Sequence, residues 1–247
     1  MAENVNTISA DCAELADETL PVISVVIPAF NEEWTLHEVI RGLDEVCAKL
    51  ASAYEIVVCD DGSSDNTLPV LRYLQTQYPY LRVLTNAKNL GVGGSLQRLY
   101  RESRGHWVAF WPADNQIAAS ELVKLWQARE YNIVIGRRIP RCDSIWRRLA
   151  SGGFNWLVRV MWQLRVYDVD SVVLYSRTAL KGEFRSRDLC LPVEILYKAH
   201  RKGLSYTEVP IGHLPRRSGK AAGCNPRTAV RTLLHMCAAR ILNTWNI

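Results

Sequence analysis

Two short β-branched runs near the start of the chain each stop at a cluster of polar, turn-forming residues. The first covers residues 22–27 and leads into Pro-Ala-Phe-Asn-Glu-Glu, and the second covers 55–59 and leads into Asp-Asp-Gly-Ser-Ser-Asp. Helical patterns follow at about 33–50 and 66–78, and a third apolar run covers 81–84. This alternation predicts consecutive βαβ units and a parallel sheet with right-handed crossovers.

The rest of the chain continues to alternate. A glycine-rich turn at Leu90–Gly94 leads into a helical pattern that runs to about residue 103. Further strands are expected at 106–111, 132–136, 169–176 and 205–209, and further helices at 119–128, 144–166, 191–202 and 227–244. No internal repeat or linker interrupts the pattern, so we predict one α/β domain over residues 21–247.

Three of these elements carry more specific expectations. Gly152-Gly153 predicts a break that divides the 144–166 stretch into two helical segments. The strand at 205–209 meets Pro210, which favours an edge strand. The terminal helix is expected to place its apolar side chains on one face. These are Val230, Leu233, Leu234, Cys237 and Ile241.

The composition is that of a globular protein in a reducing compartment. Apolar residues make up 48% of the 247 residues and charged residues 22%, which are ordinary values for a folded domain. The seven cysteines are scattered without a Cys-x-x-Cys pair and without a preceding secretory signal, which argues against a disulfide scaffold or a zinc site. No apolar window is long enough for a membrane-spanning helix, so we expect a cytoplasmic protein.

Charge is distributed unevenly, although the formal net charge is only +5. Residues 1–20 hold five acids and no Lys or Arg, which predicts a mobile acidic leader. Residues 137–165 hold seven arginines against one acid, and residues 201–247 hold eight basic residues against one acid. This field suits an anionic substrate or an anionic membrane surface. Nucleic acid is disfavoured, because no DNA- or RNA-binding motif is visible.

Polar side chains directly after the first two strands are the candidates for binding a nucleotide. Ligand crevices of open parallel sheets form at the carboxyl ends of neighbouring strands. The side chains expected there are those of Asn31, Glu32, Asp60 and Asp61. Their oxygens can accept from base N–H groups and ribose hydroxyls, with Pro28 and Ala29 contributing backbone shape only. The alternative is that one residue of each pair caps the following helix.

The motifs in these segments resemble those of family 2 glycosyltransferases with the GT-A fold. They read Val-Ile-Pro-Ala-Phe-Asn-Glu-Glu and Val-Val-Cys-Asp-Asp-Gly-Ser-Ser-Asp-Asn-Thr. Three later segments follow in the order seen in polyprenyl-phosphate (dolichol-phosphate type) sugar transferases: Trp-Pro-Ala-Asp-Asn-Gln at 111–116, Ile-Gly-Arg-Arg at 135–138, and Val-Pro-Ile with Pro-Arg-Arg-Ser-Gly-Lys within 209–220. The resemblance covers roughly residues 22–225. It implies a Rossmann-like, mostly parallel sheet flanked by helices, with C-terminal amphipathic helices.

The resemblance also implies that different parts of the domain bind the nucleotide and the acceptor. Residues of about 21–116 would bind the nucleotide and residues of about 117–225 the acceptor, with 226–247 as the terminal helix. Asn89 and Gly91 would belong to a loop near the base and the phosphates.

The metal motif departs from the family pattern. The usual Asp-x-Asp reads Pro112-Ala113-Asp114 here. Asp114 and the amide oxygen of Gln116 are therefore the expected ligands of Mg²⁺ or Mn²⁺, and we expect them on one side of an extended segment.

Arginines are the candidates for holding phosphates, because guanidinium groups bind phosphate oxygens bidentately and stay charged. The candidate acceptor-phosphate contacts are Arg137, Arg138, Arg148 and Arg216, with surface solubility as the alternative. The expected catalytic residues are Asp114, Arg138, Arg216 and Asp168. Asp168 is expected either to order the site or to contact the acceptor, and Glu194 to be structural.

The Trp-rich stretch at 144–166 is the candidate for a membrane surface, because aromatic and basic residues are interleaved on an amphipathic helix. Its apolar residues are Ile145, Trp146, Leu149, Phe154, Trp156, Leu157, Val160, Met161 and Trp162. The alternative is that this face packs on the sheet or on a twin subunit in a homo-oligomer.

Residues and resemblance together imply an inverting enzyme, peripheral on the cytosolic membrane face, that moves a hexose from a UDP- or GDP-linked sugar to a polyprenyl phosphate. Such an acceptor is already anionic and needs no general base. Two alternatives stay open. One is transfer to an alcohol acceptor such as a polysaccharide or small metabolite, which needs a base near Asp114. The other, suggested by Pro112, is a nucleotide-sugar-binding protein without activity.

Overall fold

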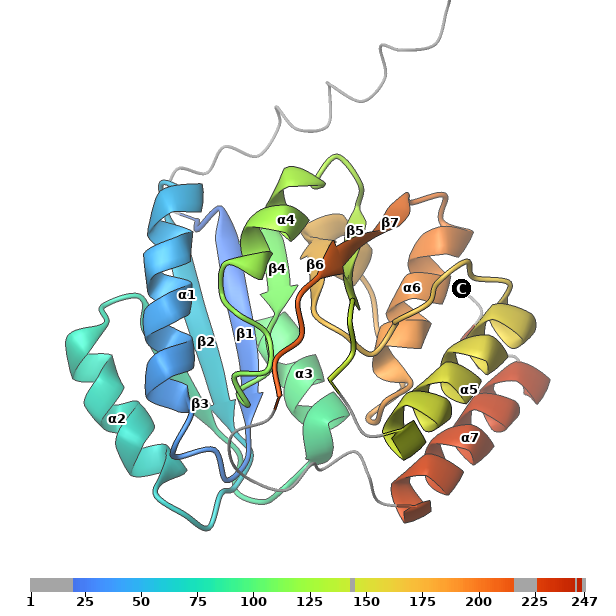
Figure 1. The fold of residues 1–247 in the computed structure, drawn as a ribbon, viewed down its shortest axis with the longest axis horizontal. Coiled ribbons are helices and arrows are strands. Elements are labelled where there is room, and N and C mark those ends of the chain that lie inside the picture. The colour runs from blue at the N-terminus through green and yellow to red at the C-terminus, as the bar shows by residue number, and fades with distance from the viewer. Residues whose placement is uncertain (1–19, 143–144, 216–225, 243, 246–247) are drawn as a thin grey trace, which may run out of the picture.

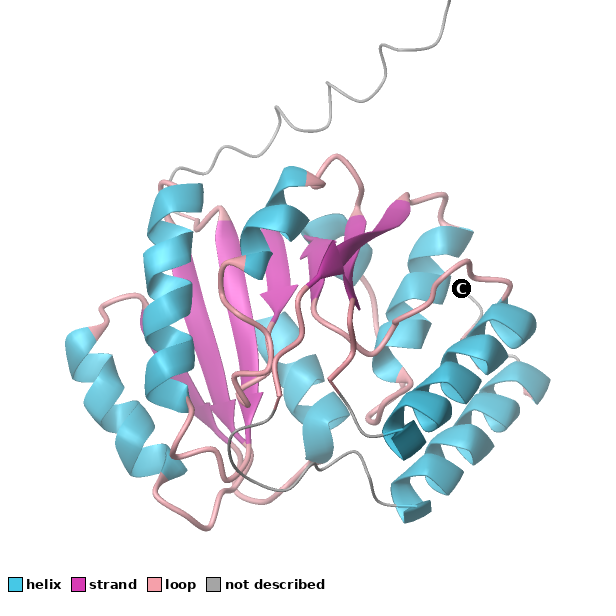
Figure 2. Cartoon of the chain, viewed as in Figure 1, coloured by secondary structure: helices cyan, strands magenta, loops and turns pink. Residues whose placement is uncertain are grey.

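The computed structural model describes residues 20–142, 145–215, 226–242 and 244–245. Seven strands form one sheet in the order β3-β2-β1-β4-β6-β5-β7, with helices on both sides (Figures 1 and 2). The strands are β1 (Ile23–Ala29), β2 (Tyr54–Asp60), β3 (Leu81–Thr85), β4 (Trp107–Phe110), β5 (Ile133–Arg138), β6 (Val173–Ser176) and β7 (Tyr206–Ile211). The helices are α1 (Leu36–Leu50), α2 (Thr67–Gln77), α3 (Gly91–Glu102), α4 (Glu121–Gln127), α5 (Ile145–Trp162), the 3-10 helix η1 (Arg177–Leu180), α6 (Leu191–Arg201) and α7 (Pro226–Ile241).

The sheet is mostly parallel, as predicted. β1 pairs in parallel with β2 and β4, β2 with β3, and β5 with β7. β6 runs antiparallel between β4 and β5. The carboxyl ends of β1, β2 and β4 therefore meet at one edge of the sheet, where the polar loops follow.

The core has two layers because successive strand residues point to opposite faces of the sheet. In β1, Val25 and Ile27 face the layer that holds α1, α2 and α4, and Val26 faces the layer that holds α3, α5 and α6. Residues Val25 to Ile27 are fully buried. Burial on both faces explains why the strands read as continuous apolar runs.

The α5 region differs from its prediction, because α5 is one continuous helix of 18 residues. A Cβ at Gly152 or Gly153 would meet no atom within 4 Å, so both glycines lie on an open helix face. Ser151 before the glycine pair and Asn155 and Val158 after it are buried, so α5 packs on the domain on both sides of the glycines. Tertiary packing thus outweighs the low helix propensity of the two glycines, which costs about 1 kcal/mol each relative to alanine.

The terminal helix is confirmed, but two of the residues predicted to share its apolar face are exposed to solvent. Leu234 and Ile241 are 64% and 80% exposed, and the side chains of Val230 and Leu233 lie outside the described part. The buried positions are Thr232, Met236 and Ala239. Small and flexible side chains let α7 approach α5, which lies beside it (Figure 1). Trp245 then stacks on Trp162, with ring centroids 4.4 Å apart.

β7 is an edge strand, as predicted, although it continues through Pro210 to Ile211. Of the acidic leader, only Leu20 lies within the described residues. None of the helices that the structure describes has the length and apolar character of a membrane-spanning segment.

Candidate functional site

The loops that follow β1 and β2 lie together at the carboxyl edge of the sheet. Ala29 at the end of β1 is the register partner of Asp60 at the end of β2. Asn31 has a left-handed backbone (φ 56°), and its N–H donates to Ser63 Oγ over 3.0 Å. Its side-chain Oδ1 accepts from the N–H of Ser64 at 2.9 Å. The Asn31 carboxamide therefore fixes the second loop against the first.

Glu32 uses its polar groups to organise the starts of α1 and α2. Its N–H donates to Thr67 Oγ1 at 2.9 Å, and its carboxylate accepts from Thr35 Oγ1 at 3.2 Å. The neighbouring Glu33 accepts from Asn66 Nδ2 at 2.7 Å. For the pair Asn31 and Glu32, these contacts favour the alternative in which one residue of the pair orders the start of the following helix.

The two aspartates after β2 are both buried but differ in their partners. Asp61 Oδ1 accepts from the N–H of Leu90 at 2.9 Å, and its Oδ2 accepts from the N–H of Gly91 at 2.9 Å. It also accepts from Asn86 Nδ2 at 2.7 Å, so this carboxylate caps the first turn of α3. Within the described residues, the carboxylate of Asp60 accepts one hydrogen bond, from the N–H of Ser63 at 3.2 Å. Asp60 thus keeps more acceptor capacity for a ligand, and Asp61 positions the glycine loop.

The glycine loop opens α3 at the same edge. Gly91 has a φ of 76°, which a residue with a Cβ adopts only with strain. Its N–H also donates to Asn89 Oδ1 at 2.9 Å. The loop predicted to lie near a base and phosphates therefore sits directly beside the aspartates after β2, with a helix N-terminus behind it.

The Asp114 segment after β4 is a turn, and the extended conformation predicted for it is wrong. Asn115 has a φ of 56°, and Asp114 Oδ1 accepts from the N–H of Gln116 at 3.1 Å. The aspartate bonds the chain two residues on, which closes a turn. Gln116 is buried, and its Nε2 donates to Leu214 O at 3.2 Å. The turn is thereby attached to the segment that follows β7.

The donor set of this turn fits a hard divalent cation. The side-chain nitrogen of Gln116 donates to Leu214 O, so the side-chain oxygen Oε1 is the atom that can act as a metal ligand. Asp114 is half-buried and supplies a carboxylate. Mg²⁺ and Mn²⁺ take oxygen ligands of this kind and complete their shells with water and phosphate oxygens. The chemistry of the turn therefore supports Asp114 and Gln116 as metal ligands, and this role stays a prediction.

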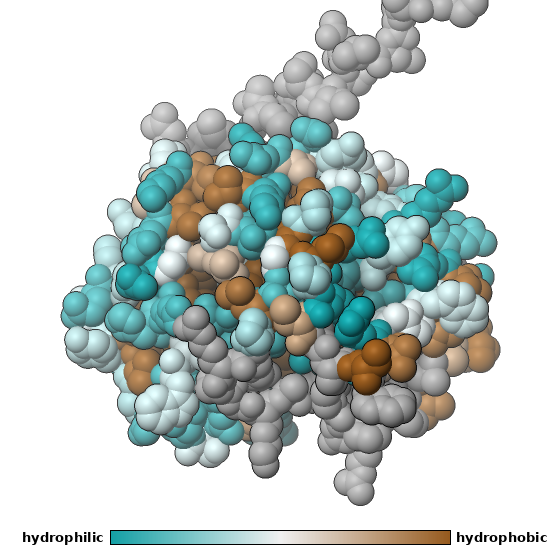
Figure 3. Space-filling view, viewed as in Figure 1, coloured by the Kyte–Doolittle hydropathy of each residue, from teal (hydrophilic) through white to brown (hydrophobic). Residues whose placement is uncertain are grey.

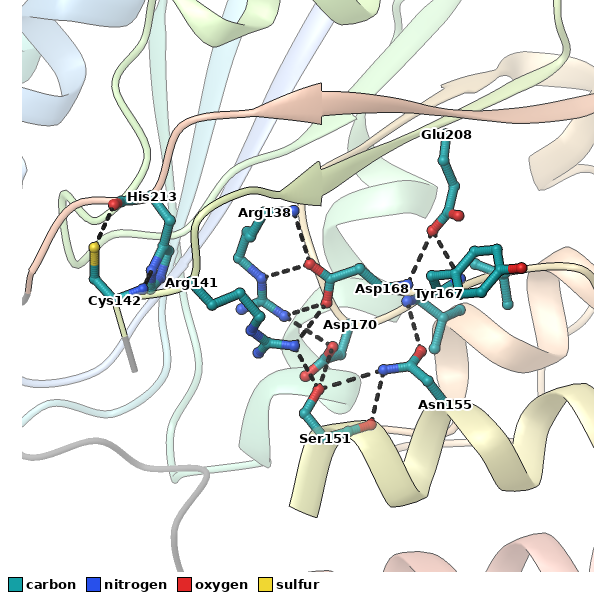
Figure 4. A network of polar contacts seen from close by, with 12 residues as sticks. Arg138, Arg141, Cys142, Ser151, Asn155, Tyr167, Asp168, Asp170, Glu208 and His213 are labelled. Carbon is teal, nitrogen blue, oxygen red and sulfur yellow. Dashed lines mark hydrogen bonds and ion pairs between the residues drawn. The ribbon is translucent and has the colours of Figure 1, made fainter. Parts of the chain in front are cut away.

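A buried network of arginines and carboxylates joins β5, α5 and the segment before β6 (Figure 4). Arg138 pairs bidentately with Asp168, Nε to Oδ2 at 2.9 Å and Nη2 to Oδ1 at 2.6 Å. Its Nη2 also donates to Asp170 Oδ1 at 2.9 Å. Arg141 Nη1 donates to Asp168 Oδ1 at 3.2 Å and to Ser151 Oγ at 2.8 Å.

The electrostatics of the network favour an ordering role for Asp168. Burial raises the pKa of Asp168, but the hydrogen bonds and charge of Arg138, together with the charge of Arg141, outweigh burial and lower the pKa below its ordinary value. A paired carboxylate of this kind is a poor general base. Arg138 in turn uses Nε and Nη2 on carboxylates, so its predicted role as a phosphate ligand is limited to its remaining donors.

A pocket of about 450 Å³ opens beside this network. Five arginines line it: Arg137, Arg138, Arg141, Arg148 and Arg159. The guanidinium groups of Arg137 and Arg159 lie over the ring of Tyr167, 4.7 and 4.9 Å from its centroid. The exposed side chains of Ile145 and Leu149 add an apolar edge. The result is a cationic pocket bordered by apolar surface.

Hydrogen bonds link the segment beside the pocket to the Asp114 turn. Cys142, next to Arg141, donates its N–H to His213 Nδ1 at 3.0 Å and its thiol to His213 O at 2.9 Å. The following Leu214 donates its N–H to Gln116 O at 2.8 Å. The segment that carries the candidate metal ligands is therefore linked by hydrogen bonds to the segment that borders the arginine pocket.

Several members of this site were not among the predicted residues. Arg141 and Asp170 could have been predicted from sequence, because Arg141 lies in the arginine run and Asp170 lies two residues after Asp168. His213 had none, since its role depends on the return of the chain after β7. Arg216 lies outside the described residues. Glu194 is buried, accepts from Lys198 Nζ at 2.8 Å and from backbone N–H groups before α6, and so is structural, as predicted.

The chain belongs to the family described as Glycosyl transferase family 2, whose sequence model matches residues 24–180. An undecaprenyl-phosphate 4-deoxy-4-formamido-L-arabinose transferase of Pseudomonas aeruginosa (strain LESB58) is 28% identical over 207 residues, covering 82% of this chain and 60% of that protein. Glycosyltransferase AglD of Haloferax volcanii is 28% identical over 236 residues, covering 90% of this chain and 37% of that protein. The chain thus spans about 60% of the length of the first of these relatives.

The fold is shared with solved structures. Glucosyl-3-phosphoglycerate synthase from Mycobacterium tuberculosis, in complex with Mn²⁺, UDP and glucosyl-3-phosphoglycerate, superimposes with a TM-score of 0.70 at 19% identity, covering 97% of this chain and 86% of that one. This likeness confirms the predicted fold class of a mostly parallel sheet flanked by helices.

Proposed function

We propose that this protein transfers a hexose from a nucleotide diphosphate sugar to a polyprenyl phosphate, with inversion at the anomeric carbon. The observation that carries the proposal is the arginine pocket with its apolar edge, which is linked to the Asp114 turn by hydrogen bonds through Cys142, His213 and Leu214. A phosphate attached to a hydrocarbon chain matches a cationic pocket bordered by apolar side chains. The named activity of the Pseudomonas relative, on undecaprenyl phosphate, supports the same acceptor class.

The donor is proposed to lie at the carboxyl edge of β1 and β2. Asp60 supplies acceptor capacity for a base N–H, and the loop capped by Asp61 presents backbone N–H groups at the start of α3. Asp114 and Gln116 would hold Mg²⁺ or Mn²⁺, which supplies charge neutralisation for the departing nucleoside diphosphate. The Mn²⁺ and UDP of the structural relative support this class of donor and metal.

The acceptor phosphate is proposed to bind Arg137 and Arg148, the two exposed predicted arginines of the pocket. A phosphate oxygen then attacks the anomeric carbon as the bond to the nucleoside diphosphate breaks, so one displacement inverts that carbon. A phosphate monoester is already anionic, so no base is required. The carboxylates of Asp168 and Glu194 are committed to ion pairs, which agrees with a base-free reaction.

The α5 face supports a peripheral position on the cytosolic membrane surface. Ile145, Leu149, Trp156 and Val160 are between 54% and 63% exposed along one helix, among several arginines. Figure 3 shows apolar patches at its lower right, where α5 and α7 lie. A lipid phosphate presented at a membrane would reach the pocket from this side.

The test is transfer of a labelled sugar to a short-chain polyprenyl phosphate, run beside a polysaccharide and a phosphorylated small metabolite. We expect product in the lipid phase, and a KM for the acceptor about 10- to 100-fold higher in Arg148→Ala, since one charge-assisted contact contributes about 1.5–3 kcal/mol. Arg72→Ala, an exposed arginine on α2, is the matched control and leaves the KM unchanged. Transfer to a soluble acceptor alone would overturn the lipid assignment, and nucleotide binding without transfer would overturn the enzymatic one.

A further inference from the structure

A cluster of three potential metal ligands lies between the start of α6 and α7, apart from the arginine pocket. It consists of Asp188, Cys190 and His235, whose ligand atoms all lie within 4.8 Å of one another. We propose that this cluster binds a transition-metal ion of the Zn²⁺ type and thereby ties α7 to the rest of the domain.

The three side chains are already held close together by hydrogen bonds. Asp188 Oδ2 lies 2.9 Å from His235 Nδ1, and Asp188 Oδ1 accepts from the N–H of Cys190 at 2.9 Å. The thiol of Cys190 faces the carbonyl of Thr232 on α7, at 3.5 Å. Two ligands therefore come from one turn and the third from a helix 45 residues later in the chain.

The ligand types point to zinc-like ions and away from Mg²⁺ or Ca²⁺. One thiolate, one imidazole and one carboxylate suit a borderline-soft tetrahedral ion, whereas the hard cations prefer oxygen alone. With metal–nitrogen and metal–oxygen bonds of about 2.1 Å, tetrahedral geometry separates N and O by roughly 3.4 Å. The Asp188–His235 pair therefore has to open by only about half an ångström to admit the ion.

The charges of the three ligands match those of a divalent ion. Binding releases the Cys190 proton to solvent, and the thiolate and the Asp188 carboxylate then balance the two charges of the ion. Asp188 and His235 are partly exposed, which gives the ion a path from solvent.

The position of the cluster indicates what the metal would stabilise. A Cβ on Gly93 would lie 2.4 Å from the N atom of Asp188, so the ligand-bearing turn presses on the first turn of α3. That turn of α3 is the one capped by Asp61. A metal at the cluster would therefore fasten α7 to a turn that supports the proposed donor loop. The proposal departs from the sequence prediction, which argued against a zinc site because no Cys-x-x-Cys pair is present.

The test is a titration of the metal-free full-length chain with Co²⁺, followed by near-ultraviolet absorption. A thiolate–Co²⁺ charge-transfer band reports a cysteine ligand, which Asp114 and Gln116 cannot supply, and its dependence on Cys190 assigns the band to the cluster. We expect a stoichiometric band that is lost in Cys190→Ser. In His235→Gln the affinity for Co²⁺ should fall more than about tenfold, since even residues behind the ligands contribute 10- to 100-fold to metal affinity. Cys237→Ser, on α7 like His235, is the matched control and keeps the band.

A second measurement covers the case in which Cys190→Ser does not fold. Stoichiometric Zn²⁺ should raise the Tm of the wild-type chain and of Cys237→Ser, but not of His235→Gln, which keeps the buried thiol intact. The absence of a thiolate band at saturating Co²⁺ would overturn the proposal. So would a band, or a Tm shift, of equal size in His235→Gln and the wild type.

Discussion

Single carboxylates at this site owe their roles to their hydrogen-bond partners. Asp60 and Asp61 are neighbours of identical chemistry, yet the Asp61 carboxylate is bound by two donors of the glycine loop and by Asn86. Asp168 is bound by two arginines and is only 2% exposed. Removing the charge of such a residue leaves its partners buried and unpaired, which costs more than the pair itself contributes.

Asp168→Asn tests this at the residue scale. We expect the free energy of unfolding to fall by about 3 kcal/mol, because the Arg138 guanidinium loses the carboxylate that binds it bidentately. Denaturant unfolding followed by circular dichroism measures the change. Glu130→Gln, an exposed acid after α4, is the matched control and shifts the value by less than about 0.5 kcal/mol. Equal stability of both variants would contradict the role given to the network.

The pH dependence of that difference has a defined sign. The pKa of Asp168 is lowered in the folded chain, so its contribution is complete above the pKa of an unfolded aspartate, about 3.9. It is lost as the pH falls through the lower folded value. The gap in unfolding free energy between wild type and Asp168→Asn should therefore narrow below about pH 4 and stay constant from about pH 5 to 7. A gap that widens on acidification would contradict this assignment.

At the scale of elements, α5 shows how tertiary packing fixes a helix that its own sequence disfavours. Gly153→Ala should raise the free energy of unfolding by about 0.5–1 kcal/mol, because the new methyl group meets nothing within 4 Å. Gly93→Ala in α3 is the contrasting variant and should destabilise the chain, since its Cβ would lie 2.3 Å from a backbone carbon of Arg187. Thermal unfolding compares the two. A destabilising Gly153→Ala would indicate that α5 does require flexibility there.

The elements also show which parts of the structure follow from sequence. The strand runs and the polar loops after β1 and β2 were predictable, because burial on both faces and the end of each strand are local patterns. The turn at Asp114 was not, since it depends on Asn115 adopting a positive φ and on Gln116 meeting Leu214 from 98 residues away. The buried face of α7 was not predictable either, because Met236 and Trp245 pack on a helix that is remote in sequence.

At the scale of the whole molecule, the exposed face of α5 predicts attraction to anionic membranes. Flotation with vesicles that contain anionic lipid should recover the wild-type chain, and Trp156→Asp should reduce the recovered fraction several-fold. Tyr73→Asp, an equally exposed aromatic on α2, is the matched control and should bind as the wild type does. Protein that stays in the aqueous fraction under all conditions would contradict a peripheral position.

The proposed function requires above all that a nucleoside diphosphate binds beside Asp114 through a divalent cation. Calorimetric titration with UDP and with GDP, in Mn²⁺ and then in EDTA, tests this directly on the wild type and on Asp114→Asn. The asparagine keeps Oδ1 as the acceptor for the N–H of Gln116, so the turn is retained while the ligand charge is lost. The prediction is binding of one nucleotide that weakens about tenfold or more in the variant and in EDTA. No binding at millimolar nucleotide, or equal binding by both proteins with and without the metal, would contradict it.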